Sequence, residues 1–245
     1  MSTMKIALIT GANKGIGFET ARQLAQRGVS VLLGSRDAKR GEEAAAILKA
    51  EGLEVTPITI DVTDPETVLA AVKQVEAQYG KLDILINNAG TGDFTKPAST
   101  ETVGEWKRVF DTNVFGLVET TRLFLPLLKK AEAGRIVNLS SILGSVSLAA
   151  DPNSPIAGSV GHYAAYGASK TAINMYTVQL ARELELEKSK IKVNVAHPGW
   201  VKTDLGGEGA PMELEEGAKT SVELALLPED GANGGYFHLG QTLPW

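Results

Sequence analysis

The chain has 245 residues and a net charge of −5, and 43% of its residues are hydrophobic and 22% charged. A chain of this size and composition can bury a full core, so we expect one α/β domain over residues 1–245. The negative charge is spread over both halves and cysteine is absent, so we expect no nucleic acid or membrane surface as partner and no disulfide or thiolate chemistry.

The first predicted strand, residues 6–9, is a short apolar run near the start of the chain. This run is too short for a signal peptide, and no later run approaches the length of a membrane span. We therefore expect a soluble cytoplasmic protein.

A glycine-rich loop, Thr10-Gly-Ala-Asn-Lys-Gly-Ile-Gly17, follows this strand and opens a predicted helix over residues 17–27. Backbone N–H groups at such a strand-to-helix turn bind the pyrophosphate of a dinucleotide. We expect Gly11 to permit the tight turn, Gly15 to let the backbone approach phosphate, and Gly17 to let the helix pack closely on the sheet. The loop therefore predicts a dinucleotide site.

The second predicted strand, residues 29–33, leads into Leu33-Gly34-Ser35-Arg36, where the choice of cofactor is made. A guanidinium at Arg36 can bind a 2′-phosphate, Lys14 adds a second positive charge, and Ser35 offers a hydroxyl donor. These residues favour NADP(H). Asp37 leaves NAD(H) open, because a carboxylate near this position can hold the ribose 2′-hydroxyl.

A helix over residues 38–51 and a strand over residues 55–60 come next, followed by Asp61-Val62. Asp61 can accept a hydrogen bond from the adenine edge while the backbone amide of Val62 donates one. The alternative is that Asp61 only caps the following helix. That helix is predicted over residues 65–79, with Asp64 as cap and Pro65 in its first turn.

The second half continues the alternation, with strands over residues 82–86, 135–139 and 191–196 and helices over residues 101–130 and 166–187. Pro126 predicts a kink or an early end in the first of these helices. The irregular segments 144–161 and 203–216 are expected to shape a substrate pocket. Alternating strands and helices predict a Rossmann-type, doubly wound parallel sheet with helices on both faces.

Tyr166 and Lys170 lie four positions apart in the helix over residues 166–187, so they share one of its faces. An ammonium beside a phenol favours the phenolate and adjusts the acidity of a proton donor. The alternative is an ordinary surface contact. Together with the glycine loop, the pair suggests hydride chemistry on a nicotinamide cofactor.

Four motifs occur in order: the glycine loop, Asn87-Asn-Ala-Gly90, the Tyr166/Lys170 pair and Pro198-Gly199. With these motifs the chain resembles the short-chain dehydrogenase/reductase family nearly from end to end. Its distal part, from His197-Pro-Gly-Trp-Val-Lys-Thr-Asp204 to the final Trp245, is similar to the NADPH-dependent carbonyl reductases of that family.

The resemblance implies a catalytic tetrad of Asn113, Ser141, Tyr166 and Lys170, with Ser141 chosen over Ser140 because the family's active serine is the second of such a pair. It also implies that Thr203 bonds the nicotinamide carboxamide and that Asn87, Ala89 and Gly90 form the cofactor-side turn. The residues expected to contact the cofactor are Gly11, Asn13, Lys14, Gly15, Ile16, Gly17, Ser35, Arg36, Asp61, Val62, Asn87, Ala89, Gly90, Tyr166, Lys170, Pro198, Gly199, Val201 and Thr203.

The predicted function is NADPH-dependent reduction of a ketone or aldehyde, with Tyr166 as general acid and Asn113 holding a water that links Lys170 to solvent. Two alternatives stay open: an NAD-dependent alcohol or sugar dehydrogenase, and a non-catalytic NADP-binding redox sensor. No metal site is expected, because the three histidines lack ligand spacing. The resemblance implies a homodimer or homotetramer, although its carbonyl reductases include monomers.

Overall fold

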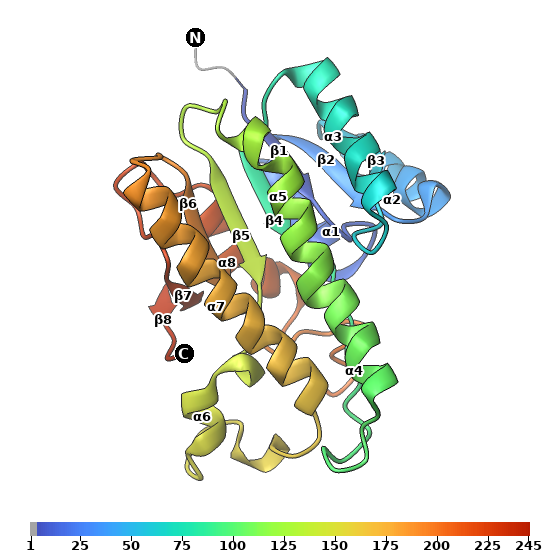
Figure 1. The fold of residues 1–245 in the computed structure, drawn as a ribbon. Helices are drawn as coiled ribbons and strands as arrows, with labels where there is room; N and C mark the ends of the chain where they lie inside the picture. The colour runs from blue at the N-terminus through green and yellow to red at the C-terminus, as the bar shows by residue number, and fades with distance from the viewer. Residues whose placement is uncertain (1–3) are drawn as a thin grey trace.

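A computed structural model describes residues 4–245, whose strands form one eight-stranded sheet in the order β3-β2-β1-β4-β5-β6-β7-β8 (Figure 1). Pairing is parallel from β3 through β7, and β8 joins antiparallel. The strands are β1 (Ile6–Ile9), β2 (Ser30–Ser35), β3 (Val55–Thr59), β4 (Ile84–Asn87), β5 (Arg135–Leu139), β6 (Lys192–Ala196), β7 (Tyr236–His238) and β8 (Gln241–Thr242).

The predicted doubly wound sheet is confirmed, and the six predicted strands are β1 to β6, with the ends of β1 and β5 as predicted and those of the other four shifted by at most two residues. The predicted domain starts at residue 1, but residues 1–3 lie outside the described part of the chain. Strands β7 and β8 were not predicted, because each is too short to show a periodicity.

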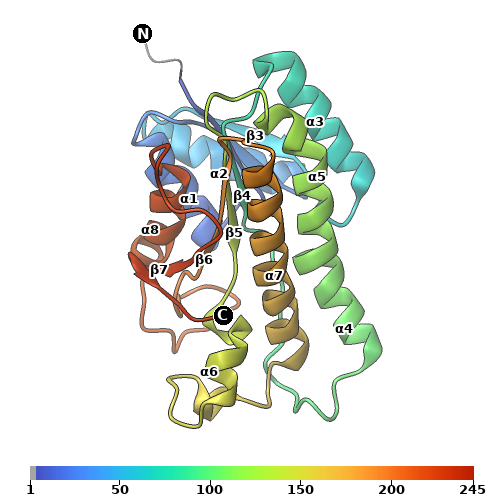
Figure 2. The ribbon, with the colours of Figure 1, turned by 60° about the vertical axis from the view of Figure 1, so that its left-hand side comes forward.

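Helices cover both faces of the sheet (Figure 2). Apolar side chains of α1 (Gly15–Ala25), α2 (Ala38–Ala50) and α8 (Leu214–Ala225) pack in one core cluster. Those of α3 (Pro65–Tyr79), α5 (Leu117–Leu128) and α7 (Ala164–Leu186) pack in the other. Neighbouring residues of β1 divide between the two, with Ile9 in the first cluster and Leu8 in the second.

The order of the strands places a crevice at the carboxyl end of β1. Strand β1 pairs with β2 on one side and with β4 on the other, so successive connections leave it in opposite directions. In such a sheet, ligands bind outside the carboxyl ends of the strands at this reversal. Figure 1 shows α6 (Val146–Ala150) and the start of α7 beyond the carboxyl end of β5, on the same side of the molecule.

The helix predicted over residues 101–130 is divided into three parts. These are α4 (Val103–Phe110), a π-helical turn (Asp111–Gly116) and α5, and Pro126 lies inside α5, which ends at Leu128. A Cβ on Gly116 would overlap the main-chain oxygen of Val62, so this glycine lets the π turn lie directly on the loop after β3. Single π turns within α-helices are often found at functional sites.

Both irregular segments contain helix that the sequence analysis did not predict. Helix α6 lies within residues 144–161, and α8 begins at Leu214, inside the segment predicted as loop 203–216. Two acidic residues, Glu215 and Glu216, occupy the first turn of α8, where negative charge stabilises the helix dipole. That acidic start is the pattern that could have indicated the helix.

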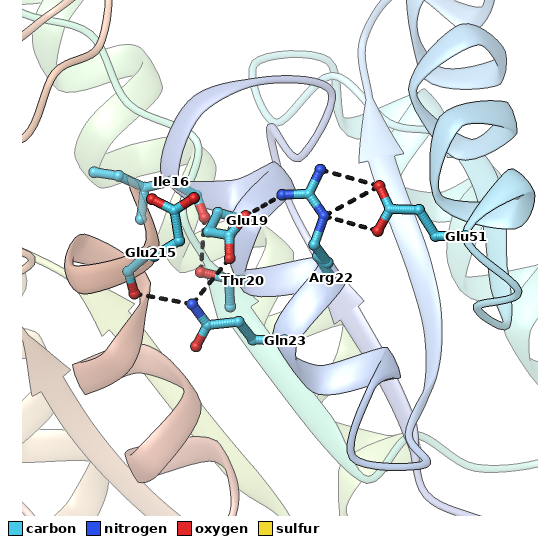
Figure 3. A network of polar contacts seen from close by, with 7 residues as sticks. All are labelled: Ile16, Glu19, Thr20, Arg22, Gln23, Glu51 and Glu215. Atoms are coloured by element: carbon cyan, nitrogen blue, oxygen red, sulfur yellow. Dashed lines mark hydrogen bonds and ion pairs between the residues drawn. The ribbon is translucent and has the colours of Figure 1, made fainter. Parts of the chain in front are cut away.

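A polar network fixes α1 against α8 and against the end of α2 (Figure 3). Glu19 is buried and pairs with Arg22, which also donates to Glu51 at a distance of 3.0 Å. The amide of Gln23 donates to Glu19 at 3.0 Å and to the main-chain oxygen of Glu215 at 2.9 Å. The network therefore holds the beginning of α8 against α1, the helix that follows the glycine loop.

Candidate functional site

A cavity of about 820 Å³ opens at the carboxyl ends of β1, β2, β4 and β5. Its size lies within the range of small-molecule and cofactor sites. The wall includes most of the residues predicted to contact a cofactor: Gly11, Asn13, Lys14, Gly15, Ile16, Gly17, Ser35, Arg36, Asp61, Val62, Ala89, Gly90, Tyr166, Lys170, Pro198 and Thr203. The predicted residues outside this wall are Asn87, Asn113, Ser141, Gly199 and Val201.

The glycine loop has the backbone that its sequence predicts. Gly11 and Gly15 have φ values of +62° and +60°, which side chains other than glycine rarely adopt. Gly17 packs somewhat differently from the prediction. A Cβ there would lie 2.9 Å from the oxygen of Gly11 and would overlap the amide of Asn88. The absence of a side chain at Gly17 therefore lets α1 lie directly against the glycine loop and against Asn88 at the end of β4.

Asn88, which the sequence analysis did not select, ties the glycine loop to the end of β4. Its Nδ2 donates to the main-chain oxygens of Thr10 and Gly11 at 2.8 and 3.0 Å. In return, the hydroxyl of Thr10 accepts from the backbone N–H groups of Asn88 and Ala89, both at 3.1 Å. These bonds give the second asparagine of Asn87-Asn-Ala-Gly90 a role of its own, because they attach the glycine loop to the end of β4.

Positive charge gathers where β2 ends. Arg36 lines the cavity together with Arg40, in the first turn of α2, which the sequence analysis missed. Asp37 caps α2 through its side chain, which accepts from the N–H of Arg40 at 3.1 Å, and it pairs with the Arg40 guanidinium at 3.7 Å. The carboxylate of Asp37, which kept NAD(H) as an alternative cofactor, thus caps α2 in this structure.

Two other residues of this region make local hydrogen bonds. The hydroxyl of Ser35 donates to the main-chain oxygen of Asp37 at 2.7 Å. Asp61 accepts at Oδ1 from the N–H and the hydroxyl of Thr63, at 2.9 and 2.7 Å, while Asp64 is the cap of α3. The helix-capping alternative for Asp61 is therefore wrong, and its contact with adenine stays a prediction.

Tyr166 and Lys170 lie in the first two turns of α7, and their residues are only 8% and 4% exposed. Burial raises the pKa of Tyr166 to about 12, against a smaller lowering by the Ser141 hydroxyl. Burial lowers the pKa of Lys170 to about 8. The expectation that Lys170 lowers the pKa of the phenol is corrected here, since desolvation of the phenolate outweighs other effects.

The ammonium of Lys170 is directed to the sheet. Nζ donates to the main-chain oxygen of Leu139 at 2.8 Å and lies 5.5 Å from the centroid of the Tyr166 ring. A Cβ on Gly90 would be 3.7 Å from Nζ, so the turn after β4 lies against the same ammonium. Lys170 thus joins the ends of β4 and β5 to the helix that carries Tyr166.

The two serines after β5 face different neighbours. Ser140 lines the cavity, and its hydroxyl donates to the main-chain oxygen of Lys170 at 3.3 Å. Ser141 caps the short helical turn that follows by accepting from the N–H of Leu143 at 3.3 Å, and its hydroxyl acts on the pKa of Tyr166. Ser141 is thus the serine whose hydroxyl acts on Tyr166. Its selection over Ser140 and its catalytic role stay predictions.

Asn113 lies in the π turn and is buried. Its Oδ1 accepts from the N–H of Thr91 at 2.8 Å, and its Nδ2 donates to the oxygen of Thr91 at 2.8 Å and to the hydroxyl of Ser169 at 3.0 Å. The side chain therefore links the loop after β4 to α7. The predicted water-mediated relay to Lys170 stays a prediction.

The remaining residues outside the cavity wall support it from behind. Asn87 donates to Thr121 and Asn138 at 2.9 and 2.8 Å within the core. Gly199 has a φ of +92°, and a Cβ there would overlap Met212. Val201 pairs with Met212 in an isolated bridge, so it anchors the loop after β6.

His197, directly after β6, supports the loops around the cavity. Its Nδ1 accepts from the N–H groups of Ile142 and Gly199, both at 3.3 Å. Burial lowers its pKa to about 3, and His238 adds to the effect. A neutral His197 thus joins the loops that follow β5 and β6, next to Ser141.

No group of three or more His, Cys, Asp or Glu side chains within residues 4–245 is placed to hold a metal ion. In the same range, each helix is too short or too polar to cross a bilayer.

Comparison with known proteins places this site in a family. A family model described as short chain dehydrogenase matches residues 5–213. The chain is 40% identical over 227 residues to short-chain dehydrogenase anuI of Penicillium roqueforti, covering 91% of this chain and 89% of that protein. It is 34% identical over 281 residues to carbonyl reductase (NADPH) 1 of Mus musculus, covering 100% and 99%. The solved structure of NADPH-bound carbonyl reductase from chicken fatty liver aligns with a TM-score of 0.86 at 29% identity, over 99% of both chains.

Proposed function

The chain belongs to the short-chain dehydrogenase family, and on this premise we propose that it reduces a ketone or aldehyde to the alcohol with NADPH. One observation carries the proposal: the side chains of Tyr166 and Lys170 lie in the wall of the cavity that also contains the glycine loop. A proton donor and a dinucleotide cradle therefore face the same space. The similarity to NADPH-dependent carbonyl reductases supports the same reaction class.

The residues present fit NADP(H). Backbone N–H groups at the start of α1, with no side chain at Gly15, suit a pyrophosphate. Lys14, Arg36 and Arg40 supply positive charge for a 2′-phosphate, while the Asp37 carboxylate is engaged in capping α2. When bound, the cofactor supplies the hydride.

Tyr166 is the proposed general acid. Its raised pKa keeps the phenol protonated at neutral pH, which is the form that a proton donor needs. An alkoxide is a far stronger base than a phenolate, so the proton passes from Tyr166 to the substrate oxygen as negative charge develops there. Ser141, whose hydroxyl acts on the same phenol, is proposed to stabilise that charge by hydrogen bonding.

Lys170 is proposed to bind the ribose hydroxyls of the cofactor and to return a proton to Tyr166. A pKa of about 8 leaves its ammonium largely protonated at neutral pH. Asn113 holds Thr91 and Ser169 in place beside this pair and is proposed to position a water for the relay. A proton leaving the phenol can then be replaced from solvent.

The substrate is proposed to be an apolar carbonyl compound. Phe94 contacts the Tyr166 ring edge-on at a centroid distance of 5.0 Å, and Leu205 lines the cavity. Ile142, Leu143 and Trp200 are further apolar residues of the flanking loops. A small, highly polar sugar would find few partners on such a surface.

A panel of aldehydes and ketones incubated with NADPH tests the proposal, with absorbance at the reduced nicotinamide band as the readout. Oxidation of NADPH with formation of the alcohol is the expected result. Binding of NADPH without oxidation across the panel would favour the redox sensor. Faster oxidation of alcohols with NAD⁺ than with NADP⁺ would favour the NAD-dependent dehydrogenase. The cytoplasmic location and the dimeric or tetrameric state stay predictions.

A further inference from the structure

An ion pair crosses the mouth of the cavity between two segments far apart in the chain. Lys14, in the glycine loop, donates to Oδ2 of Asp204 at 2.5 Å, and both residues line the cavity. Both side chains are open to solvent, with exposed fractions of 63% and 80%. The proposed ligand of Lys14 is a phosphate, so the carboxylate stands where an anion of the cofactor would be bound.

Asp204 belongs to a loop, residues 203–211, which we call the flap. The segments on either side of the flap are bonded to each other: Val201 bridges to Met212, and the N–H of Met212 donates to the oxygen of Trp200 at 3.2 Å. Beyond Met212, α8 is fixed by the bond from Gln23 to Glu215 (Figure 3). The ends of the flap are therefore anchored to the body of the protein.

Within the flap the hydrogen bonds are local. Gly206 donates to the Thr203 hydroxyl at 2.9 Å, and the indole of Trp200 donates to the oxygen of Gly206 at 2.8 Å. In the described residues 4–245, the hydrogen bonds and ion pairs of the flap stay within residues 200–213, with one exception. The exception is the pair of Asp204 with Lys14. Asp204 is thus the side chain that forms the polar bond between the flap and the glycine loop.

We propose that Asp204 competes with the 2′-phosphate of NADP(H) for Lys14 and so sets the affinity for the phosphorylated cofactor. This inference rests on the proposed function, because it takes the ligand of Lys14 from it. Lys14 must give up the carboxylate before it pairs with phosphate, and the carboxylate repels the incoming anion. Both effects weaken binding of the cofactor that carries the additional phosphate.

The competition predicts that removing the negative charge improves binding. Asp204→Asn keeps the size of the side chain, and its dissociation constant for NADPH should fall by about two- to fivefold, the range expected for an exposed ion pair. That for NADH should change by less. Glu208→Gln is the matched control, because it removes one negative charge from the same exposed flap and should leave both constants unchanged. Isothermal titration calorimetry measures these constants without turnover.

A double-mutant cycle separates the specific pair from general charge. On a Lys14→Met background, Asp204→Asn should no longer tighten NADPH binding. An unchanged or weaker affinity in Asp204→Asn, an equal gain for NADH, or the same gain without Lys14 would each overturn the inference. The unaltered protein distinguishes the two proposals: if it binds neither cofactor, the proposed function fails, whereas normal binding with no effect of Asp204→Asn defeats only this inference.

Discussion

The Nζ of Lys170 lies 2.8 Å from the main-chain oxygen of Leu139, so the ammonium is attached to the end of β5. This bond holds the lysine at the base of the cavity, close to the turn at Gly90. Because the charged group is buried there, it titrates near physiological pH, at a pKa of about 8. The cavity therefore contains an ammonium whose charge depends on pH in the range in which enzymes are assayed.

Binding of NADPH should weaken as the pH rises through about 8. Deprotonation of Lys170 removes the positive charge that favours an anionic cofactor, and its pKa of about 8 sets the range of the effect. The dissociation constant should increase toward about tenfold per pH unit above that value. Fluorescence titrations between pH 6.5 and 9.5 measure it. Lys170→Met should bind NADPH more weakly and show a flat profile, and a variant with the original pH dependence would assign the titration to another group.

Tyr166→Phe should lose about 100- to 10,000-fold in turnover, the usual contribution of a general acid. NADPH affinity should stay nearly unchanged, because the ring, with its contact to Phe94, is kept. Steady-state rates on any substrate found in the carbonyl panel, with calorimetric binding of NADPH, check both parts. Near-normal turnover in this variant would remove Tyr166 as the acid.

Arg36→Ala and Arg40→Ala should each raise the Michaelis constant for NADPH more than that for NADH. Both residues line the cavity, and a charge-assisted hydrogen bond is worth about 1.5–3 kcal/mol, or about 10- to 150-fold. Lys39→Ala, between them in sequence, is the control, since its residue is exposed and is not part of the cavity wall. Equal increases in the Michaelis constants for the two cofactors would argue against binding of a 2′-phosphate at the end of β2.

Gly17→Ala should lower both stability and cofactor affinity. A Cβ at this position would overlap Asn88 and lie 2.9 Å from the oxygen of Gly11, so the glycine loop must shift. We expect a loss of about 1–3 kcal/mol in the free energy of unfolding. Chemical denaturation measures it, together with a weaker calorimetric affinity for NADPH.

Gly104→Ala makes the same chemical change in α4, at an exposed site. There the added methyl has room, so the variant should be as stable as the unaltered protein or more stable, by about 0.5–1 kcal/mol. If the substitutions at positions 17 and 104 had similar effects, close packing of the glycine loop would not be the reason for Gly17.

Local patterns were enough to predict much of the fold. Apolar runs located β1 to β6, and their alternation with helices predicted the parallel sheet. The glycines after β1 and the four-residue spacing of Tyr166 and Lys170 predicted two walls of the cavity. Each of these features depends on residues close together in sequence, whose periodicity or turn geometry is determined by neighbours.

Only the tertiary structure decided how these parts act on one another. Asn88 locks the glycine loop, Arg40 adds a charge beside Arg36, and Asp204 pairs with Lys14 across 190 positions of the chain. Burial, which no local pattern measures, raises the pKa of Tyr166, whereas its lysine neighbour was expected to lower it. Such effects depend on contacts between distant segments and on exclusion of water, and both arise only when the strands and helices pack together.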